Sequence, residues 1–230
     1  MELRCENISR SFLRGSGESN VFYAVKPSDF ILCEGKVTEI IGRSGSGKTT
    51  FINMLSGLLT PSEGKVIVDG KDLYSMSDED RSLFRNKHIG MIPQGQTALG
   101  SLTVLENILL PVRMYGDNED RLRSCSNKAI ELMERLGIKG LEEVFPKELS
   151  GGEIRRMAII RALINDPEII IADEPTGDLD DKTTADVLDL LQERSVKGSS
   201  VLIVTHEKEA LNYADIIYRM DAGDIRSYNV

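Results

Sequence analysis

The chain has 230 residues, enough for one large α/β domain with its own hydrophobic core. Its 28 basic and 37 acidic residues give a net charge of −9, which argues against a charge-driven grip on nucleic acid, so we expect no nucleic-acid partner. The three cysteines lack CxxC spacing, and the longest apolar runs are strand-sized rather than membrane-spanning. We therefore expect one cytosolic domain over residues 1–230 that performs any membrane work through another polypeptide.

The first half of the chain begins with β-rich pieces and then becomes helical. Residues 1 to about 25 combine short strand-like segments with a predicted hairpin tip at residues 14–20, and residues 36–41 (KVTEII) predict a strand that ends at Gly42. Helical spacing then recurs twice, in Phe51, Met54, Leu55 and Leu58, and in Ala129, Leu132, Met133 and Leu136 before a stop at Gly137. Each set predicts one apolar helix face that packs on a neighbouring layer.

The second half alternates between helices and apolar strands. Helices are predicted over residues 153–164, around residues 184–191 and around Ala210, and strands over residues 168–173, 199–205 and 216–220. Strands without polar alternation, separated by helices, are typical of a parallel sheet covered on both faces. The β-rich start and a helical middle section, about residues 99–149, read as additions around that core.

A glycine-rich string, GRSGSGKT at residues 42–49, matches the phosphate-loop pattern GxxxxGK[ST] between a predicted strand and a predicted helix. Its glycines let backbone N–H groups wrap a phosphate at a positive helix end. Lys48 is predicted to reach the β- and γ-phosphates of ATP, and the Thr49 hydroxyl to bind Mg²⁺. The structural alternative is a strand-to-helix turn with an incidental lysine. The predicted nucleotide-binding residues here are Gly42, Arg43, Ser44, Gly45, Ser46, Gly47, Lys48, Thr49 and Thr50.

Two acids, Asp173 and Glu174 in EIIIADEPT, follow a fully apolar strand. Ligands gather at the carboxyl ends of strands in open α/β sheets, and a carboxylate there is costly to desolvate without a cation. Asp173 therefore suits the Mg²⁺ shell. Glu174, which points the other way on an extended backbone, is predicted to hold the attacking water at the γ-phosphate. The alternative is a pair of solvated acids at a strand end.

A second glycine-rich helix start lies at LSGGE, residues 149–153. Ser150, Gly151 and Gly152 offer a hydroxyl and unhindered N–H groups, but one ATP has only one terminal phosphate. The simplest explanation is that two copies pair head to tail and each lends this loop to the ATP of the other. The alternative is that Ser150 and Glu153 form a capping box and nothing more.

The string LSGGE followed by IRRMAIIRAL resembles the signature of ATP-binding-cassette (ABC) ATPases, and the resemblance covers nearly the whole chain in the family's order. Residues 42–50 match its Walker A motif, residues 169–175 its Walker B motif and residues 177–180 (GDLD) its D-loop. The resemblance implies a RecA-like P-loop NTPase core with a mostly parallel sheet, an N-terminal antiparallel β subdomain and an inserted helical subdomain over about residues 95–155. It also implies a homodimer formed on ATP.

The resemblance assigns roles to four further residues, each with a structural alternative. Gln94 is expected to link Mg²⁺ to the helical insert, although a solvated loop amide is the alternative. His206, which follows an apolar strand, is expected to bond the γ-phosphate and the D-loop rather than to be an ordinary strand-end imidazole. Asp178 is expected at the dimer interface, and Asp178 and Asp180 are also candidate helix caps. Phe12 is expected to stack on adenine, unless it is a core residue.

Within the family, the chain resembles the branch of the MacB, LolD and FtsE type. Those ATPases act with a transmembrane permease of the FtsX/MacB-like type, which implies a peripheral position on the cytoplasmic face of the membrane and export or release of a peptide, drug or lipoprotein. A regulatory ATPase that transmits force to an extracytoplasmic enzyme is the alternative. Soluble relatives that act on DNA or ribosomes carry coiled coils or tandem cassettes, which this chain lacks, and a small-molecule kinase would explain neither LSGGE nor His206. Pro93 departs from the family, which more often has an aromatic residue there.

Overall fold

The structure is a computed structural model that describes residues 1–13, 21–95, 97–114, 116, 118–206 and 209–228. The predicted hairpin tip at residues 14–20 and Gln96 lie outside the described residues. Within the described part of the chain, no helix combines the length and the apolar character needed to cross a membrane.

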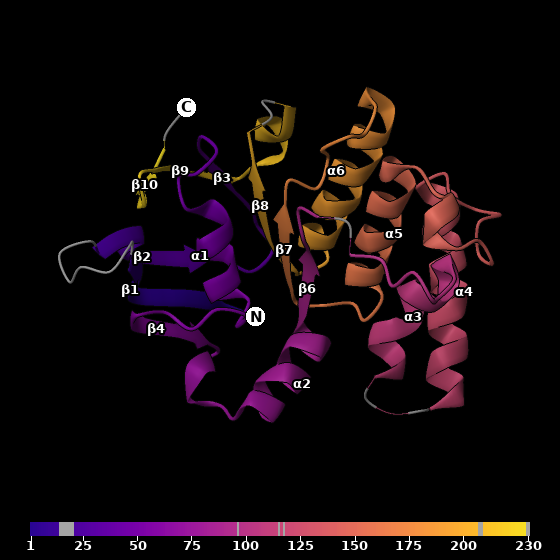
Figure 1. Cartoon of the computed structure of the whole chain (residues 1–230), viewed down its shortest axis with the longest axis horizontal. Helices are drawn as coiled ribbons and strands as arrows, with labels where there is room; N and C mark the ends of the chain where they lie inside the picture. Colours follow the sequence, from indigo (N-terminus) through magenta and orange to yellow (C-terminus); the bar gives the residue numbers. More distant parts are fainter. Residues whose placement is uncertain (14–20, 96, 115, 117, 207–208, 229–230) are drawn as a thin grey trace.

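An antiparallel sheet forms one end of the molecule (Figure 1). Its strand order is β2-β1-β4-β5, with bounds Leu3–Leu13 for β1, Val21–Leu32 for β2, Glu63–Val68 for β4 and Lys71–Asp72 for β5. Strand β2 continues well past Val25 and contains Pro27, which an edge strand tolerates because one row of its N–H groups has no ladder partner. The β-rich beginning is therefore two long strands rather than several short ones.

The second sheet has the order β10-β9-β3-β8-β7-β6, and the predicted parallel core is confirmed. All neighbours from β9 to β6 are parallel, and β10 adds an antiparallel edge. Every residue of β7 and β8 is buried, as continuous apolar runs require. The bounds are Val37–Ile41 for β3, Ile89–Ile92 for β6, Ile169–Asp173 for β7, Ser200–Thr205 for β8, Ile216–Asp221 for β9 and Asp224–Ser227 for β10.

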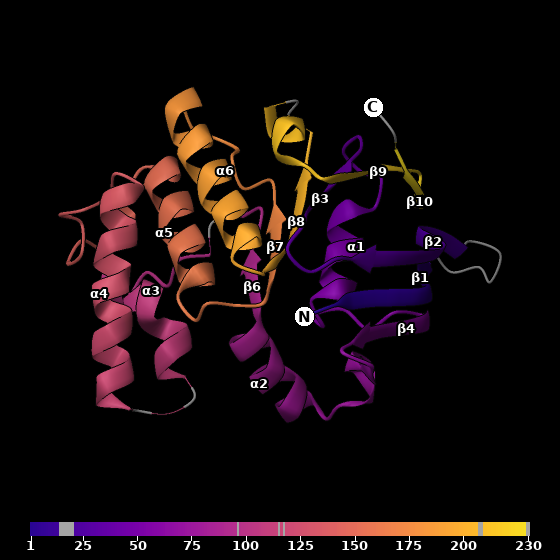
Figure 2. The ribbon, with the colours of Figure 1, turned by 180° about the vertical axis from the view of Figure 1, so that it is seen from behind.

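Helices cover both faces of the parallel sheet (Figures 1 and 2). Helix α1 packs between the two sheets, whereas α5 and α6 cover the opposite face and α3 and α4 lie beyond them. The α-helices span Lys48–Leu55 (α1), Asp78–His88 (α2), Val104–Arg113 (α3), Glu119–Arg135 (α4), Gly151–Leu163 (α5) and Asp181–Val196 (α6). Short 3-10 helices span Leu73–Ser75, Pro146–Glu148 and Glu209–Tyr213, so the helix expected around Ala210 is a 3-10 turn.

One predicted core position is wrong. Helix α1 ends at Leu55, and Gly57, at φ +75°, turns the chain away before the next helical turn can form. Phe51, Met54 and Leu55 are buried as predicted, but Leu58 is 58% exposed. The helical spacing of four apolar residues thus continued by coincidence past the end of the helix.

Candidate active site

The glycine-rich loop connects β3 to α1 and leaves no room for side chains at two positions. A Cβ at Gly47 would lie 2.0 Å from the Ala24 carbonyl oxygen, and one at Gly42 would lie 2.3 Å from the Met220 carbonyl oxygen. Gly47 is the N-cap of α1 at φ 108°, a conformation that favours glycine. Ala24 comes this close because the β1–β2 register skips one residue there, between the pairs Arg10–Val25 and Ser11–Tyr23.

The Lys48 ammonium group is buried at the mouth of this loop. Its Nζ donates hydrogen bonds to the carbonyl oxygens of Gly42 at 2.7 Å and Arg43 at 3.1 Å. Burial lowers the pKa of Lys48, and the nearby carboxylates of Glu174 and Asp173 oppose that shift. The side chain thus places a positive charge where the backbone N–H groups of the loop and helix end gather.

Asp173 lies across the cleft from α1, at the end of β7. Its Oδ2 accepts a hydrogen bond of 2.9 Å from the Thr49 hydroxyl, and its side chain is almost completely buried. Burial is the main cause that raises the pKa of Asp173, and the hydrogen bond from Thr49 opposes it. A carboxylate and a hydroxyl at this separation are hard oxygen donors of the kind that Mg²⁺ prefers.

Glu174 and His206 meet at the ends of β7 and β8. The Glu174 N–H donates to the Val204 carbonyl oxygen at 2.7 Å, and its Oε1 lies 3.0 Å from His206 Nδ1. The predicted extended backbone is wrong, because Glu174 adopts φ +50°, in the left-handed region. The two acids nevertheless contact different groups, with Asp173 on Thr49 and Glu174 on His206.

Lys48, Asp173 and Glu174 line one cleft of about 380 Å³, and His206 lies outside its described lining, in contact with Glu174. The donor set of the cleft fits a magnesium nucleotide, with a lysine and a glycine loop for phosphates, oxygen donors for a cation and two aromatic rings at its rim. The buried Ser46 hydroxyl also has no hydrogen-bond partner in the described structure. The described residues that line the cleft are Phe12, Phe22, Ala24, Ser44, Gly45, Gly47, Lys48, Thr49, Thr50, Gln94, Asp173 and Glu174.

The LSGGE segment does not line that cleft in the described structure. Ser150 is the N-cap of α5 and forms a complete capping box with Glu153, because the Glu153 N–H donates to Ser150 Oγ at 3.3 Å and Glu153 Oε2 accepts from the Ser150 N–H at 2.7 Å. Ser150 and Gly151 are exposed. The capping box between Ser150 and Glu153 is therefore formed, and Ser150 and Gly151 remain exposed at the surface.

The D-loop lies beside this segment in the same chain. A Cβ at Gly152 would be 3.5 Å from the Asp178 carbonyl oxygen. Asp180 caps α6 by accepting from the Thr183 N–H at 2.9 Å, so this predicted cap is confirmed. Asp178 is not the N-cap and instead turns the backbone at φ +65°.

Two arginines of α5 form contacts that the sequence analysis missed. Arg155 donates from Nη1 to the Pro93 carbonyl oxygen at 2.7 Å and from Nη2 to the Gln94 carbonyl oxygen at 2.8 Å. Arg161 donates to the Thr97 carbonyl oxygen at 2.8 Å. The only sequence signal was the basic character of IRRMAIIRAL, which gives no partner. These contacts fasten the backbone around Gln94 to the helix that follows LSGGE.

Comparisons with known proteins show which family this chain resembles. The profile described as ABC transporter matches residues 25–177. The lipoprotein-releasing system ATP-binding protein LolD of Coxiella burnetii is 35% identical over 226 residues, which cover 98% of this chain and 95% of that protein. An uncharacterized ABC transporter ATP-binding protein of Methanocaldococcus jannaschii is 40% identical over 212 residues, 92% of each chain.

Among solved structures, a dimeric ATP-binding cassette in a post-hydrolysis state, bound to ADP and Pi, matches with a TM-score of 0.88 and 30% identity over 99% of this chain and 98% of that chain. The likeness confirms the predicted fold class, an α/β cassette with a RecA-like core, an antiparallel β subdomain and a helical subdomain. The chain therefore belongs to the ABC transporter family and is one of its ATP-binding, ATP-hydrolysing cassettes.

Proposed function

We propose that the chain is the ATPase subunit of an ABC transporter, that it dimerises on ATP, and that it drives a separate transmembrane permease of the FtsX/MacB-like type. Export or release of a peptide, drug or lipoprotein is the function that this partner type supports, with the cassette held at the cytoplasmic face of the membrane by the permease. The proposal treats residues 1–230 as one ATPase domain and about residues 95–155 as its helical subdomain. The names of the relatives, among them a lipoprotein-releasing system protein, support this reading.

One observation supports the proposed ATP-induced dimer above the others. Among the described residues, the cleft is lined by the loop and the start of α1, the Walker B acids, Gln94 and the β1–β2 rim, whereas the LSGGE segment, with Ser150 and Gly151 exposed, lies outside it. A second copy in two-fold arrangement would bring Ser150, Gly151 and Gly152 to the open side of the cleft. The dimeric cassette bound to ADP and Pi, at 30% identity, supports this arrangement.

Within such a pair, the predicted site residues of one copy have the following proposed roles. Lys48 and the N–H groups of residues 42–50 hold the β- and γ-phosphates, and Phe12 stacks on the base. Thr49, Gln94 and Asp173 hold Mg²⁺, which when bound neutralises charge on the phosphate oxygens. Glu174 orients and deprotonates the attacking water, and His206 leaves its contact with Glu174 to bond the γ-phosphate.

Arg155 provides a route from the nucleotide to the helical subdomain. It holds the main chain at Pro93 and Gln94 and lies beside Gly177 at the start of the D-loop. Movement of the Gln94 side chain toward a bound cation would therefore pull on the α5 helix through two hydrogen bonds.

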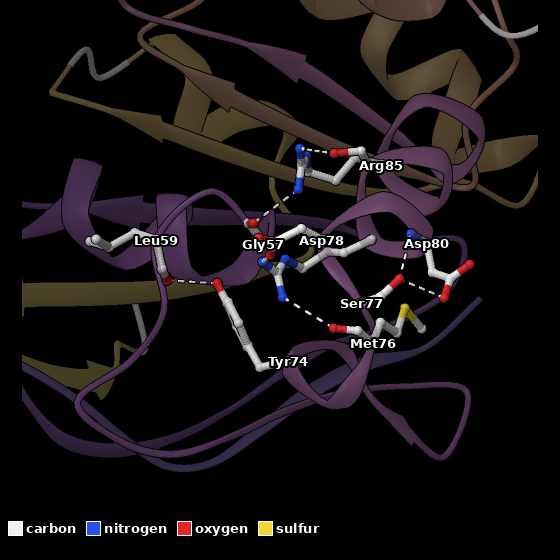
Figure 3. Close-up of polar contacts among 10 residues, drawn as sticks. Gly57, Leu59, Tyr74, Met76, Ser77, Asp78, Asp80 and Arg85 are labelled. Atoms are coloured by element: carbon white, nitrogen blue, oxygen red, sulfur yellow. Dashed lines mark hydrogen bonds and ion pairs between the residues drawn. The ribbon is translucent and has the colours of Figure 1, made fainter.

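We assign a groove of about 330 Å³ to a short cytoplasmic helix of the permease. The groove lies between α2, β6 and the ends of α3 and α5, and two of its lining side chains, Leu58 and Met114, are large, apolar and more than half exposed. Figure 3 shows the contacts of the residues on either side of Leu58. Arg85 Nη1 donates to the Gly57 carbonyl oxygen at 3.1 Å, and the Tyr74 hydroxyl donates to the Leu59 carbonyl oxygen at 2.6 Å. An exposed leucine fixed from both sides is a surface suited to a partner.

Glu174→Gln tests the catalytic and dimer assignments together. We expect ATP binding to persist, turnover to fall at least about 100-fold, and a dimer to accumulate in Mg²⁺ and ATP by sedimentation. Adding Ser150→Arg should abolish that dimer while the monomer keeps its ATP affinity. A Glu174→Gln sample that remains monomeric at high protein concentration contradicts the shared site.

Co-purification from detergent-solubilised membranes tests the permease. Leu58→Asp should lose the stoichiometric partner and keep ATP binding, whereas Leu83→Asp, at an exposed leucine of α2 that does not line the groove, should retain it. A partner with four membrane spans and a large extracytoplasmic domain supports the FtsX/MacB-like assignment. A partner of another architecture contradicts it.

A further inference from the structure

The turn between β9 and β10 lies against the phosphate loop. The two strands pair Asp221 with Asp224, so the turn between them has two residues, Ala222 and Gly223, at φ +46° and +81°. Positive φ at both central residues is typical of a type I′ hairpin turn, in which the N–H groups of those two residues take no part in the strand ladder. The N–H group of Gly223 is therefore available to bond outside the hairpin.

Gly223 joins two segments that are distant in the sequence. Its N–H donates to the Ser46 carbonyl oxygen at 2.9 Å, and its carbonyl oxygen accepts from the Lys26 N–H at 2.8 Å. Gly223 is buried, and a Cβ there would lie 3.1 Å from the carbonyl oxygens of both Tyr23 and Ala24. The turn thus fits closely between β2 and the phosphate loop, and a side chain at this position would force one of them to move.

The hydrogen bond from Gly223 fixes which way one peptide group of the phosphate loop faces. The Ser46 carbonyl and the Gly47 N–H belong to the same peptide, and in a planar trans peptide these two groups point in opposite directions. Gly47 lines the nucleotide cleft, whereas Gly223 is not among the described residues that line it. With its carbonyl oxygen held by Gly223, this peptide turns its N–H group toward the cleft.

Glycine at position 47 makes the opposite orientation of this peptide accessible. Glycine populates positive and negative φ about equally readily, so rotation of the peptide between Ser46 and Gly47 meets little steric resistance from the backbone itself. The rotated peptide would aim a carbonyl oxygen at a bound phosphate, which repels it. Gly223 opposes the rotation, because the rotated form would set the Gly47 N–H against the Gly223 N–H and leave both buried donors unsatisfied.

We propose that Gly223 is a positioning residue for the phosphate loop, and that it keeps the peptide between Ser46 and Gly47 in the orientation that donates an N–H group to the nucleotide phosphates. The inference rests on the proposed nucleotide site and gives a part in it to the β9–β10 hairpin, whose turn sequence, DAGD, carries no phosphate-binding pattern. Gly223 touches no substrate. It acts through the fraction of chains whose loop is ready to bind, which scales the apparent affinity for any triphosphate.

Gly223→Ala tests this role, because the added methyl group should push the turn away from β2 and the loop. Binding of ATP and of inorganic triphosphate should each weaken about tenfold. The KM for ATP should rise to a similar extent while kcat stays within about twofold, since the N–H group contacts phosphate both before and during the reaction. A variant that merely unfolds in part would instead lose kcat at an unchanged KM.

Gly70→Ala is the matched control for backbone strain. Gly70 has φ +80°, close to that of Gly223, and a Cβ there has no described atom within 4 Å. It lies in the turn between β4 and β5, away from the phosphate loop in the sequence and in the sheet order. Gly70→Ala should therefore lose a similar amount of stability and leave both affinities and KM unchanged.

A second pair of variants removes the hydrogen bond without adding a side chain. A synthetic peptide of residues 222–230, ligated through Ala222→Cys, can carry an ester in place of the amide that supplies the Gly223 N–H. Against the same ligated chain with all its amides, the dissociation constant and KM for ATP should rise at least about threefold. An ester at Tyr228, whose N–H donates to the Ile217 carbonyl oxygen at 2.8 Å, should change neither quantity.

The outcomes separate the positioning role from the nucleotide site itself. A loss of kcat at unchanged KM in Gly223→Ala would mean that the turn supports only the fold, and it overturns the proposal. Unchanged ATP affinity in the chain with the ester at Gly223 overturns it as well, even if Gly223→Ala does not fold. An unaltered chain that binds neither ATP nor inorganic triphosphate would instead count against the proposed function.

Discussion

The two glycine-rich helix starts of this chain look alike in sequence and differ in structure. At α1 the N-cap is Gly47, no side chain caps the helix, and no acid lies in its first turn. At α5 the N-cap is Ser150, which forms a closed capping box with Glu153. The first helix start therefore leaves its N–H groups and its dipole for a ligand, whereas the second already satisfies part of them with its own carboxylate.

In the proposed dimer, this difference would explain why the first helix start binds a phosphate alone and the second needs a partner copy. Hydrogen bonds from Ser150 are the main cause that lowers the pKa of Glu153, so this acid is ionised at neutral pH and offsets the positive end of α5. An anion at Ser150 and Gly152 must then gain binding energy elsewhere. In the proposed dimer, a γ-phosphate held by Lys48 of the other copy would supply that energy.

The largest expected effect on stability is at the first helix start, where a single added methyl group has no room. Gly47→Ala places a Cβ 2.0 Å from the Ala24 carbonyl oxygen at φ 108°, so we expect the free energy of unfolding to fall by about 3 kcal/mol or more and ATP binding to be lost. Gly45→Ala, at φ +78° in open space, should cost only about 1 kcal/mol. Urea unfolding measures both variants. Equal losses would mean that close packing at Gly47 does not define the first start.

The next effect concerns Glu39, in the strand that carries the first loop. Glu39 is fully buried, neither carboxylate oxygen has a hydrogen-bond partner in the described structure, and burial raises its pKa to about 7 from 4.5. Between these two values the folded chain holds a proton that the unfolded chain has released. The contribution of Glu39 to the free energy of unfolding should therefore fall by about 3 kcal/mol as pH rises from 4.5 to about 7, and change no further above that.

Glu39→Gln should remove most of that slope, as measured by urea unfolding across the same pH range. The exposed Glu63, at the start of β4, provides the control, because Glu63→Gln should keep the slope. A slope that persists in Glu39→Gln would assign it to another group. Glu153, at the second helix start, should cause no such loss, because it is only partly buried and is already hydrogen-bonded to Ser150.

The smallest expected effect on stability is at the second start. A Cβ at Gly152 would meet its neighbours at 3.5 Å, an ordinary contact, and alanine suits a helix better than glycine. Gly152→Ala should change the free energy of unfolding of the monomer by no more than about 0.5 kcal/mol. In the proposed dimer its ATPase activity should nevertheless fall at least tenfold, since the methyl group would lie against Asp178 of the D-loop, at the proposed dimer interface. Full activity would show that the contact between Gly152 and the D-loop does not matter for turnover.

The sequence predicted features that local chemistry decides. The phosphate loop, the apolar runs of strands β7 and β8 and the Asp180 cap follow from short patterns whose physical reason is contained in the pattern. Other features depend on contacts between distant segments. The register skip at Ala24 brings its carbonyl oxygen close to Gly47. The Arg155 contacts form only because the fold brings residues 93–94 next to α5. The left-handed backbone of Glu174 occurs where the end of β7 bonds to β8. The predicted burial of Leu58 was wrong because apolar periodicity does not show where a helix ends.

The contacts of Lys48 within its own loop set a threshold for small anions. Its ammonium already commits two of its three N–H donors to the carbonyl oxygens of Gly42 and Arg43, so an anion finds one donor free and must compete for the other two. A polyphosphate chain, which presents several charged oxygens at once, should therefore displace these contacts more readily than a small monoanion such as acetate.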